Sequence, residues 1–207
     1  MAHWADTTEV AYQAMRTIFE HFELEVPSRS TFLENITSGK LLEFYRERGI
    51  PPHITRKDLN VLWERHFNNP EHRGNIPLRE GAREALLACR DGRAKVAIVS
   101  GSTHNIIQAS ISRFGIGDFI DHLEADAHGK IEELRRVFTR FFVQPEEMVY
   151  IDDTYEGLCA AKSIGAAAVG ITGGFGMREH LLQANPDHLI TNLHELIPLI
   201  GTNRAEQ

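Results

Sequence analysis

The amino-acid sequence predicts an α/β protein with helices on both faces of a parallel sheet and a separate helical unit beside it. Two observations lead to this fold class. Residues 6–70 show helical periodicity without a strand signal, whereas short β-rich runs alternate with helical patterns from about residue 79 onward. A length of 207 residues, of which 42% are hydrophobic, is enough for one such core and a small accessory unit.

Apolar residues of the first segment recur at helical spacing. They repeat every four positions from Val10 to Phe22 and predict an amphipathic helix over 6–22. Two further helices are predicted at about 41–48 and 55–67, each followed by a proline-containing segment that stops it. The first part of the chain is therefore expected to be entirely helical.

Residues 6–78 form the predicted helical domain and residues 79–201 the predicted α/β domain. Right-handed crossovers between its strands would make the sheet parallel, so that the carboxyl ends of the strands meet at one edge. Strands are expected at 95–99, 148–151, 167–171 and 188–190. Helices are expected at 79–90, 103–114, 131–142, 155–164, 177–183 and 192–200.

Two adjacent carboxylates, Asp152 and Asp153, end the strand expected at 148–151. Side chains in this position face the crevice in which open parallel sheets bind ligands. Neighbouring acids repel each other unless Mg²⁺, a basic residue or a shared proton compensates them. Asp153 and Glu156 also fit a capping box for the following helix. The sequence leaves both interpretations open.

A second strand end carries hydroxyl groups and a glycine. The strand expected at 95–99 stops at Ser100-Gly101-Ser102, just before a helix. Hydroxyls and the N–H groups of a helix start can hold a phosphate, although the segment from Ser100 to Thr103 could equally supply an ordinary N-cap. Lys130 lies at the start of a later helix, where a cation opposes the helix dipole. That lysine indicates either an anion site or an ordinary solvated side chain.

Ser100, Lys130 and the Asp152-Asp153 pair follow one another along the chain in that order. Motifs of this kind in this order resemble those of the haloacid dehalogenase-like phosphohydrolases, in particular the phosphoglycolate phosphatase-like group. The resemblance extends over about residues 6–200. It implies a Rossmann-like core with a helical cap, Mg²⁺ as cofactor and a small phosphorylated metabolite as substrate. The matching segments are Val96–Ser102, Lys130, Tyr150–Thr154, Ala160–Gly165 and Val169–Gly176.

The resemblance also implies roles for individual residues. In the family, an aspartate attacks the phosphoester and forms an aspartyl phosphate that water then hydrolyses. Ser100 and Lys130 would be catalytic, and together with Gly101 and Ser102 they would bind the transferring phosphoryl group. The implied Mg²⁺ ligands are Asp153, Asp152 and Glu156.

The chain departs from the family pattern in three places. Asp152 stands where many members have glycine, and Gly157 stands where many have a second acid. The third departure is the largest, because the second aspartate of the family's Asp-x-Asp motif aligns with Met1 and the nucleophile position precedes it. Asp6 is a poor replacement for the nucleophile, because Asp6 and Glu9 read as a capping box.

The third departure predicts a gap in the sheet. The resemblance places the missing central strand between those that end at Ser100 and Asp153. Because neighbouring strands lie about 4.8 Å apart, its absence would leave a slot roughly twice that width. Three outcomes are expected. The sheet closes, another segment or chain enters the slot, or the natural polypeptide begins earlier than this sequence does. Residues 1–5 would then be a remnant of the first-strand loop.

The chain as written is thus expected to be an inactive or truncated phosphatase-type hydrolase. The alternative is a non-catalytic relative, a pseudophosphatase that keeps a phosphate or cation pocket or only a protein-interaction surface. A net charge of −7 gives no basic surface for nucleic acid. No apolar run approaches the roughly 20 residues that span a membrane, and nothing resembles a signal peptide, so a cytoplasmic location is expected. The sequence indicates no oligomeric state.

Several other features receive ordinary interpretations. Cys89 and Cys159 are expected to be buried thiols, and His122 and His128 to lie in a polar loop rather than at a metal. The Gly173–Gly176 stretch lacks dinucleotide-binding spacing, and the resemblance makes it a loop beside the active-site crevice. Trp63 and Phe67 are expected in the core of the helical domain rather than against a substrate.

Overall fold

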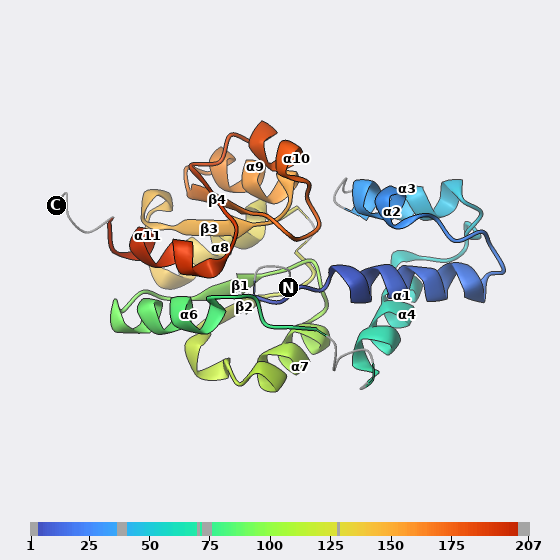
Figure 1. Cartoon of the computed structure of the whole chain (residues 1–207), viewed down its shortest axis with the longest axis horizontal. Coiled ribbons are helices and arrows are strands. Elements are labelled where there is room, and N and C mark those ends of the chain that lie inside the picture. The colour runs from blue at the N-terminus through green and yellow to red at the C-terminus, as the bar shows by residue number, and fades with distance from the viewer. Residues whose placement is uncertain (1–3, 37–40, 70, 72–75, 128, 203–207) are drawn as a thin grey trace.

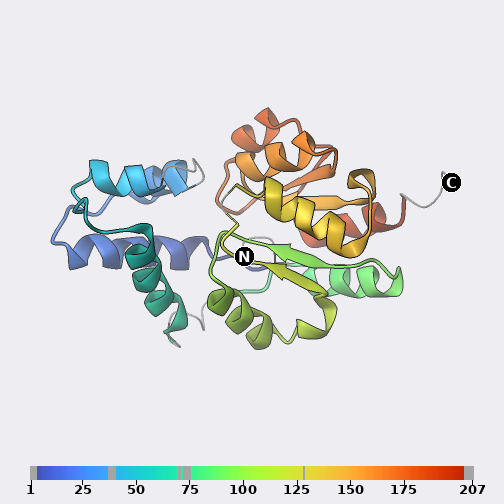
Figure 2. The ribbon, with the colours of Figure 1, turned by 180° about the vertical axis from the view of Figure 1, so that it is seen from behind.

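The computed structural model describes residues 4–36, 41–69, 71, 76–127 and 129–202. It has two parts, which Figures 1 and 2 show from opposite sides. Helices α1 to α4 make up the helical part, and strands β1 to β5 with their helices make up the α/β part. The α/β fold class predicted from the sequence is confirmed.

The helical part is built around aromatic residues. Phe19, Phe32 and Tyr45 are fully buried in its core, and Phe19 packs against Tyr45 with ring centroids 5.6 Å apart. Helix α1 also packs against α4. The described helices are α1 (Thr8–His21), α2 (Arg29–Ile36), α3 (Leu41–Glu47) and α4 (Arg56–Asn68).

Helix α2 is not among the elements that the sequence predicts. Its eight residues make about two turns and include only three apolar side chains, Phe32, Leu33 and Ile36, which is too short a pattern to show helical periodicity. Helix α1 begins differently from the expected capping box. Thr7 is its N-cap and makes no side-chain cap bond, while the Asp6 carboxylate accepts the Thr8 N–H at 3.1 Å.

The α/β part follows the predicted alternation. Strand β2 is the element that the sequence misses, because its three residues are half-buried and form no apolar run. The strands are β1 (Ala97–Val99), β2 (His122–Glu124), β3 (Val149–Asp152), β4 (Ala167–Ile171) and β5 (His188–Ile190). The α-helices are α6 (Ala82–Asp91), α7 (His104–Phe114), α8 (Ile131–Phe141), α9 (Tyr155–Ser163), α10 (Arg178–Gln183) and α11 (Ile197–Thr202). Short 3-10 helices are η1 (Gly117–Phe119), η2 (Pro145–Glu147) and η3 (Leu193–Leu196).

The strands form two parallel sheets. Strand β1 pairs with β2, and β3, β4 and β5 pair in that order. Within the described residues β1 and β3 are not hydrogen-bonded to each other, so the sheet does not close between the strand that leads to Ser100 and the strand that ends at Asp152. Side chains of α8 and α9 cover one face of the sheets, and side chains of α6 and η3 pack on the other.

Trp4 lies beside the break between the sheets. Its side chain packs both against the apolar cluster around Val169 and Leu193 and against the cluster around Leu86 and Ile98. One residue thus contacts the cores of both sheets. The expectation that another segment would occupy the slot stays a prediction.

The two chain segments that join the parts run side by side. The Asp6 N–H donates to the Pro77 carbonyl at 3.2 Å, and the Arg79 N–H donates to the Trp4 carbonyl at 2.8 Å. Ala5 and Leu78 form an antiparallel bridge between these bonds. Such paired connections fix where the helical part stands over the carboxyl ends of the strands.

The cysteines and His122 differ from what the sequence predicts. Cys89 and Cys159 are free thiols, but both are half-buried rather than buried because each lies at the edge of a helix packing face. His122 lies in β2 and hydrogen-bonds Glu124 rather than standing in a loop, whereas His128 lies outside the described residues. In the part of the chain that the structure describes, no helix is long and apolar enough to cross a membrane.

Candidate phosphate and cation site

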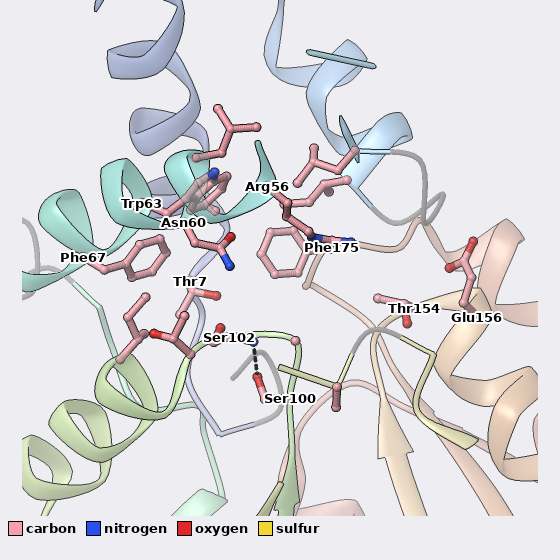
Figure 3. A pocket seen from close by; sticks show the side chains of 18 of the residues that line it. Thr7, Arg56, Asn60, Trp63, Phe67, Ser100, Ser102, Thr154, Glu156 and Phe175 are labelled. Atoms are coloured by element: carbon pink, nitrogen blue, oxygen red, sulfur yellow. Dashed lines mark hydrogen bonds between the residues drawn. The ribbon is translucent and has the colours of Figure 1, made fainter. Parts of the chain in front are cut away.

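A pocket of about 300 Å³ is lined by residues of both parts. Figure 3 shows Asn60 and Trp63 of α4 on one side and the Ser100–Ser102 turn on the opposite side. Lys130 and Asp153, two of the predicted site residues, also line it. Three segments far apart in the sequence therefore meet at one place, as their positions at strand ends predict.

Ser100 lies directly after β1 and is 4% exposed. Its hydroxyl accepts the Ser102 N–H at 3.1 Å, and its own N–H donates to the Glu124 carbonyl at 2.9 Å. The N-cap of α7 is Thr103, the last residue of the Ser100–Thr103 segment, although its side chain makes no cap hydrogen bond. The Ser100–Thr103 turn, including Gly101, lines the pocket just before the first turn of α7. A helix start of this kind favours an anion.

Lys130 is the N-cap residue of α8 and has a left-handed backbone with φ 61°. Its ammonium group forms a hydrogen-bonded ion pair with the Asp152 carboxylate, whose side chain is completely buried. Lysine has no side-chain hydrogen bond that favours this backbone region, so the conformation is held by its surroundings. A cation at this helix start opposes the helix dipole, and the Asp152 carboxylate compensates for that unfavourable position.

Asp152 accepts hydrogen bonds on both carboxylate oxygens. Oδ2 receives the Tyr150 hydroxyl at 2.7 Å as well as the Lys130 ammonium. Oδ1 receives the Thr154 N–H at 2.9 Å and the Thr154 hydroxyl at 2.8 Å. Four donors match the roughly four lone-pair positions of a carboxylate. Burial raises the pKa of Tyr150 well above its ordinary value, with the Asp152 charge as a further cause.

Asp153 is buried beside Asp152 and points toward the loop after β4. Its Oδ2 accepts the Phe175 N–H at 3.0 Å, and the Arg79 guanidinium lies 3.8 Å from the same oxygen. Burial raises the pKa of Asp153 to about 6, and the neighbouring Asp152 charge adds to this effect. A Cβ on Gly174 would lie 1.9 Å from Asp153 Oδ2, so glycine is needed there.

The helix after the two acids begins at Thr154 rather than Asp153. The Thr154 hydroxyl accepts the Gly157 N–H at 3.1 Å and makes Thr154 the N-cap of α9. The capping-box interpretation of Asp153 is therefore wrong, because the adjacent threonine performs this role. Glu156 lines the pocket, and desolvation raises its pKa.

The donor set fits a hard cation at Asp153 better than at Asp152. Asp153 lines the pocket as a carboxylate whose charge is costly where it stands, and Glu156 adds a carboxylate to the same lining. Asp152 already accepts four hydrogen bonds. Among the described residues, no three His, Cys, Asp or Glu side chains converge as a complete metal-binding group. The predicted participation of Asp152 in Mg²⁺ binding stays a prediction.

Several residues of the site are not among those predicted. Arg79 donates to the Thr172 carbonyl at 3.0 Å and the Gly173 carbonyl at 3.2 Å, and so holds the loop that contacts Asp153. It belongs to the paired connections through its N–H, and the sequence shows it only as an unremarkable arginine before a helix. Phe175 packs against the core of the helical part and also lines the pocket. Its position in the predicted loop at 173–176 is the one signal that could have found it.

A serine turn, a lysine and buried acids at the ends of parallel strands, beneath a helical unit, define a Rossmann-like phosphohydrolase type of site. The chain belongs to the haloacid dehalogenase-like hydrolases, whose family model matches residues 4–171. The family resemblance noted from the sequence is therefore confirmed.

Individual relatives agree with this family. The chain is 25% identical to the phosphoglycolate phosphatase of Vibrio vulnificus over 123 residues, which are 57% of this chain and 54% of that protein. It is 24% identical to the pyrophosphatase PpaX of Listeria monocytogenes over 204 residues, 94% of this chain and 90% of that protein. The structure of CbbY from Rhodobacter sphaeroides in complex with phosphate matches with a TM-score of 0.81 and 22% identity, covering 95% and 92% of the two chains. That structural likeness supports the fold.

Proposed function

We propose that this fold serves the hydrolysis of a small phosphorylated metabolite, with residues 6–78 as the cap domain and residues 79–201 as the core domain. The observation that carries the proposal is the convergence of Ser100, Lys130 and Asp153 on one pocket. The names of the relatives, a phosphoglycolate phosphatase and a pyrophosphatase, agree with a small phosphorylated substrate.

In this proposal the Ser100–Ser102 turn and Lys130 bind the phosphoryl group. The N–H groups at the start of α7 and the Ser100 hydroxyl are neutral donors, and Lys130 supplies positive charge. Phosphoryl transfer is accelerated mainly by positioning and by charge stabilisation, which these groups provide without forming a covalent bond to the substrate.

Asp152 positions Lys130 and thereby fixes the charge that faces the phosphoryl group. Its hydrogen bonds to Tyr150 and Thr154 hold the carboxylate in place, so the lysine has a rigid partner. Asp153 and Glu156 would hold Mg²⁺, which would supply charge neutralisation at the phosphoryl oxygens. This assignment moves Asp152 from the metal set that the family resemblance implies to a role in positioning Lys130.

The 207 residues contain no Asp-x-Asp motif, and the proposal therefore includes no turnover by this polypeptide alone. Asp6 is no substitute, because its carboxylate accepts the Thr8 N–H and Thr7, rather than Asp6, is the residue of this pair that lines the pocket. A phosphoenzyme requires a nucleophile in line with the phosphorus. The second candidate function is that of a relative that binds phosphate without hydrolysing it.

The phosphate pocket is tested by titrating the chain with inorganic phosphate and with tungstate. We expect amide NMR signals of residues 100–103 to shift and Lys130→Ala to weaken the affinity by tenfold or more, because a charge-assisted bond is lost. Lys95→Ala is the matched control, since Lys95 forms an exposed ion pair with Asp121. Signals near Ser100 that do not respond to either anion would exclude the phosphate pocket.

A further inference from the structure

The wall of the pocket opposite the serine turn is mainly apolar, although Arg56 and Asn60 also belong to it. Trp63 and Phe67 of α4 line it, as does Phe175 from the loop after β4, and all three are labelled at the cavity in Figure 3. Leu41, Leu42 and Leu59 complete this set, which we call the apolar wall. The expectation that Trp63 and Phe67 only fill the core is thus incomplete, because both also face the pocket.

Helix α4 changes character along the face that it turns to the pocket. Arg56 and Asn60 line the pocket from its first half, and Trp63 and Phe67 from its second half. These positions are spaced by three or four residues and therefore share one helix face. Helix α4 packs against α7, so the apolar end of this face lies over the segment that leads from the serine turn.

The aromatic part of the wall is preorganised. Trp63 is stacked on Phe67 with centroids 5.7 Å apart and an interplanar angle of 21°, and it is also stacked on Phe32 at 6.4 Å. Phe32 is fully buried in the core of the helical part. An aromatic side chain that already packs against two others loses little conformational freedom when a ligand contacts it, so contact with an apolar group is favoured.

Charge on the pocket lining is distributed unevenly. Of the described lining residues, Lys130 and Arg56 carry positive charge, and Lys130 stands at the phosphate end. An anionic group placed against Trp63 and Phe67, rather than beside Arg56, would lose hydration without an ionic partner. A volume of about 300 Å³ holds one phosphoryl group together with a group about the size of a single ring.

We propose that the substrate is the phosphate monoester of an aromatic or similarly bulky apolar group, whose apolar part lies against the apolar wall. The inference rests on the proposed function, since the phosphate end is the site described above. It differs from the names of the relatives, because phosphoglycolate and pyrophosphate are small and anionic throughout. Arg56 and Asn60 would then contact a polar substituent of the apolar group.

The test compares the binding of inorganic phosphate, methylphosphonate and phenylphosphonate to the full chain by calorimetry. We expect phenylphosphonate to bind about tenfold to hundredfold more tightly than methylphosphonate, from burial of the ring. In Trp63→Ala this ratio should fall toward one while the affinity for inorganic phosphate is retained. Trp4→Phe leaves Trp63 as the single tryptophan, so its fluorescence reports whether the ring reaches the wall.

Phe22→Ala is the matched control. Phe22 is also half-buried in the helical part, but it follows the last turn of α1, about 20 Å along that helix from its start near the pocket. It should leave the phenyl preference unchanged. Equal affinity for the two phosphonates, with phosphate binding intact, would overturn this inference and leave the proposed function standing. Failure of all three probes to bind would overturn both.

Discussion

The Asp152 carboxylate fills the space beside Gly157 in which a side chain at that position would otherwise lie. A Cβ on Gly157 would lie 2.0 Å from Asp152 Oδ2 and 2.2 Å from its Cγ, far inside van der Waals contact. Asp152 therefore requires glycine at position 157, one turn into α9. The acid at position 152 and the glycine at position 157, two departures from the family pattern, are sterically linked in this chain.

Gly157→Ala should lower the free energy of unfolding by about 1–3 kcal/mol, because Cβ displaces a carboxylate that holds Lys130. In an Asp152→Gly background the same change should be neutral or stabilise the protein by roughly 0.5–1 kcal/mol, since alanine is the better helix former. Chemical denaturation of the four proteins of this cycle measures the effect.

Gly117→Ala is a suitable control, because its Cβ would meet Ile111 at an ordinary 3.6 Å. An equal cost of Gly157→Ala in both backgrounds would show that Asp152 does not occupy this space.

Asp153 should make stability depend on pH in metal-free buffer. Its pKa is raised from 3.8 to about 6 by burial and by Asp152, so between these values the folded protein holds a proton that the unfolded chain has released. The free energy of unfolding should therefore decrease as pH rises through this interval. Asp153→Asn should remove that decrease and stabilise the protein at pH 7 by on the order of 2 kcal/mol.

The Arg79 charge lowers the pKa of Asp153, so Arg79→Met should move the decrease in stability to higher pH. Urea denaturation at several pH values, with EDTA present, measures both variants. A pH profile of Asp153→Asn that is parallel to that of the parent chain would mean that Asp153 is ionised without penalty in the fold.

Lys130 and Asp152 should be strongly coupled energetically. Lys130→Met leaves a buried carboxylate without its cation and should cost about 3–5 kcal/mol. The double variant with Asp152→Asn should cost much less than the sum of the two single changes, because no buried charge remains. If Lys130→Met does not fold, folding of the double variant still demonstrates the coupling. Additive costs in the thermodynamic cycle would assign both residues to independent roles.

The convergence of Ser100, Lys130 and Asp153 could be predicted because it depends on local signals. Each residue follows an apolar strand or opens a helix, and parallel topology then brings strand ends together. The same reasoning could not assign a partner to Asp152. Its bonds to Tyr150 and Thr154 are local, but the choice of Lys130 over a metal depends on where α8 stands in three dimensions.

Long-range contacts account for most of what the sequence leaves open. Arg79 acts on carbonyls 93 and 94 positions away, and a single sequence carries no record of that distance. Strand β2 exists because Val96 and its neighbours provide hydrogen-bonding partners, since its own residues show no apolar run. The break in the sheet, in contrast, could be predicted from the sequence, because the Asp-x-Asp motif of the first strand can be looked for position by position.

Turnover tests the central claim, which is that this chain holds a phosphate site but no nucleophile. The measurement is Mg²⁺-dependent hydrolysis of p-nitrophenyl phosphate by the 207-residue chain and by a version with a strand ending in Asp-x-Asp-Gly-Thr-Leu added ahead of Ala5. We expect no activity from the first and, from the second, a higher melting temperature with activity that disappears when the first added aspartate becomes asparagine. Robust hydrolysis by the unmodified chain, abolished by Asp153→Asn, would contradict the account.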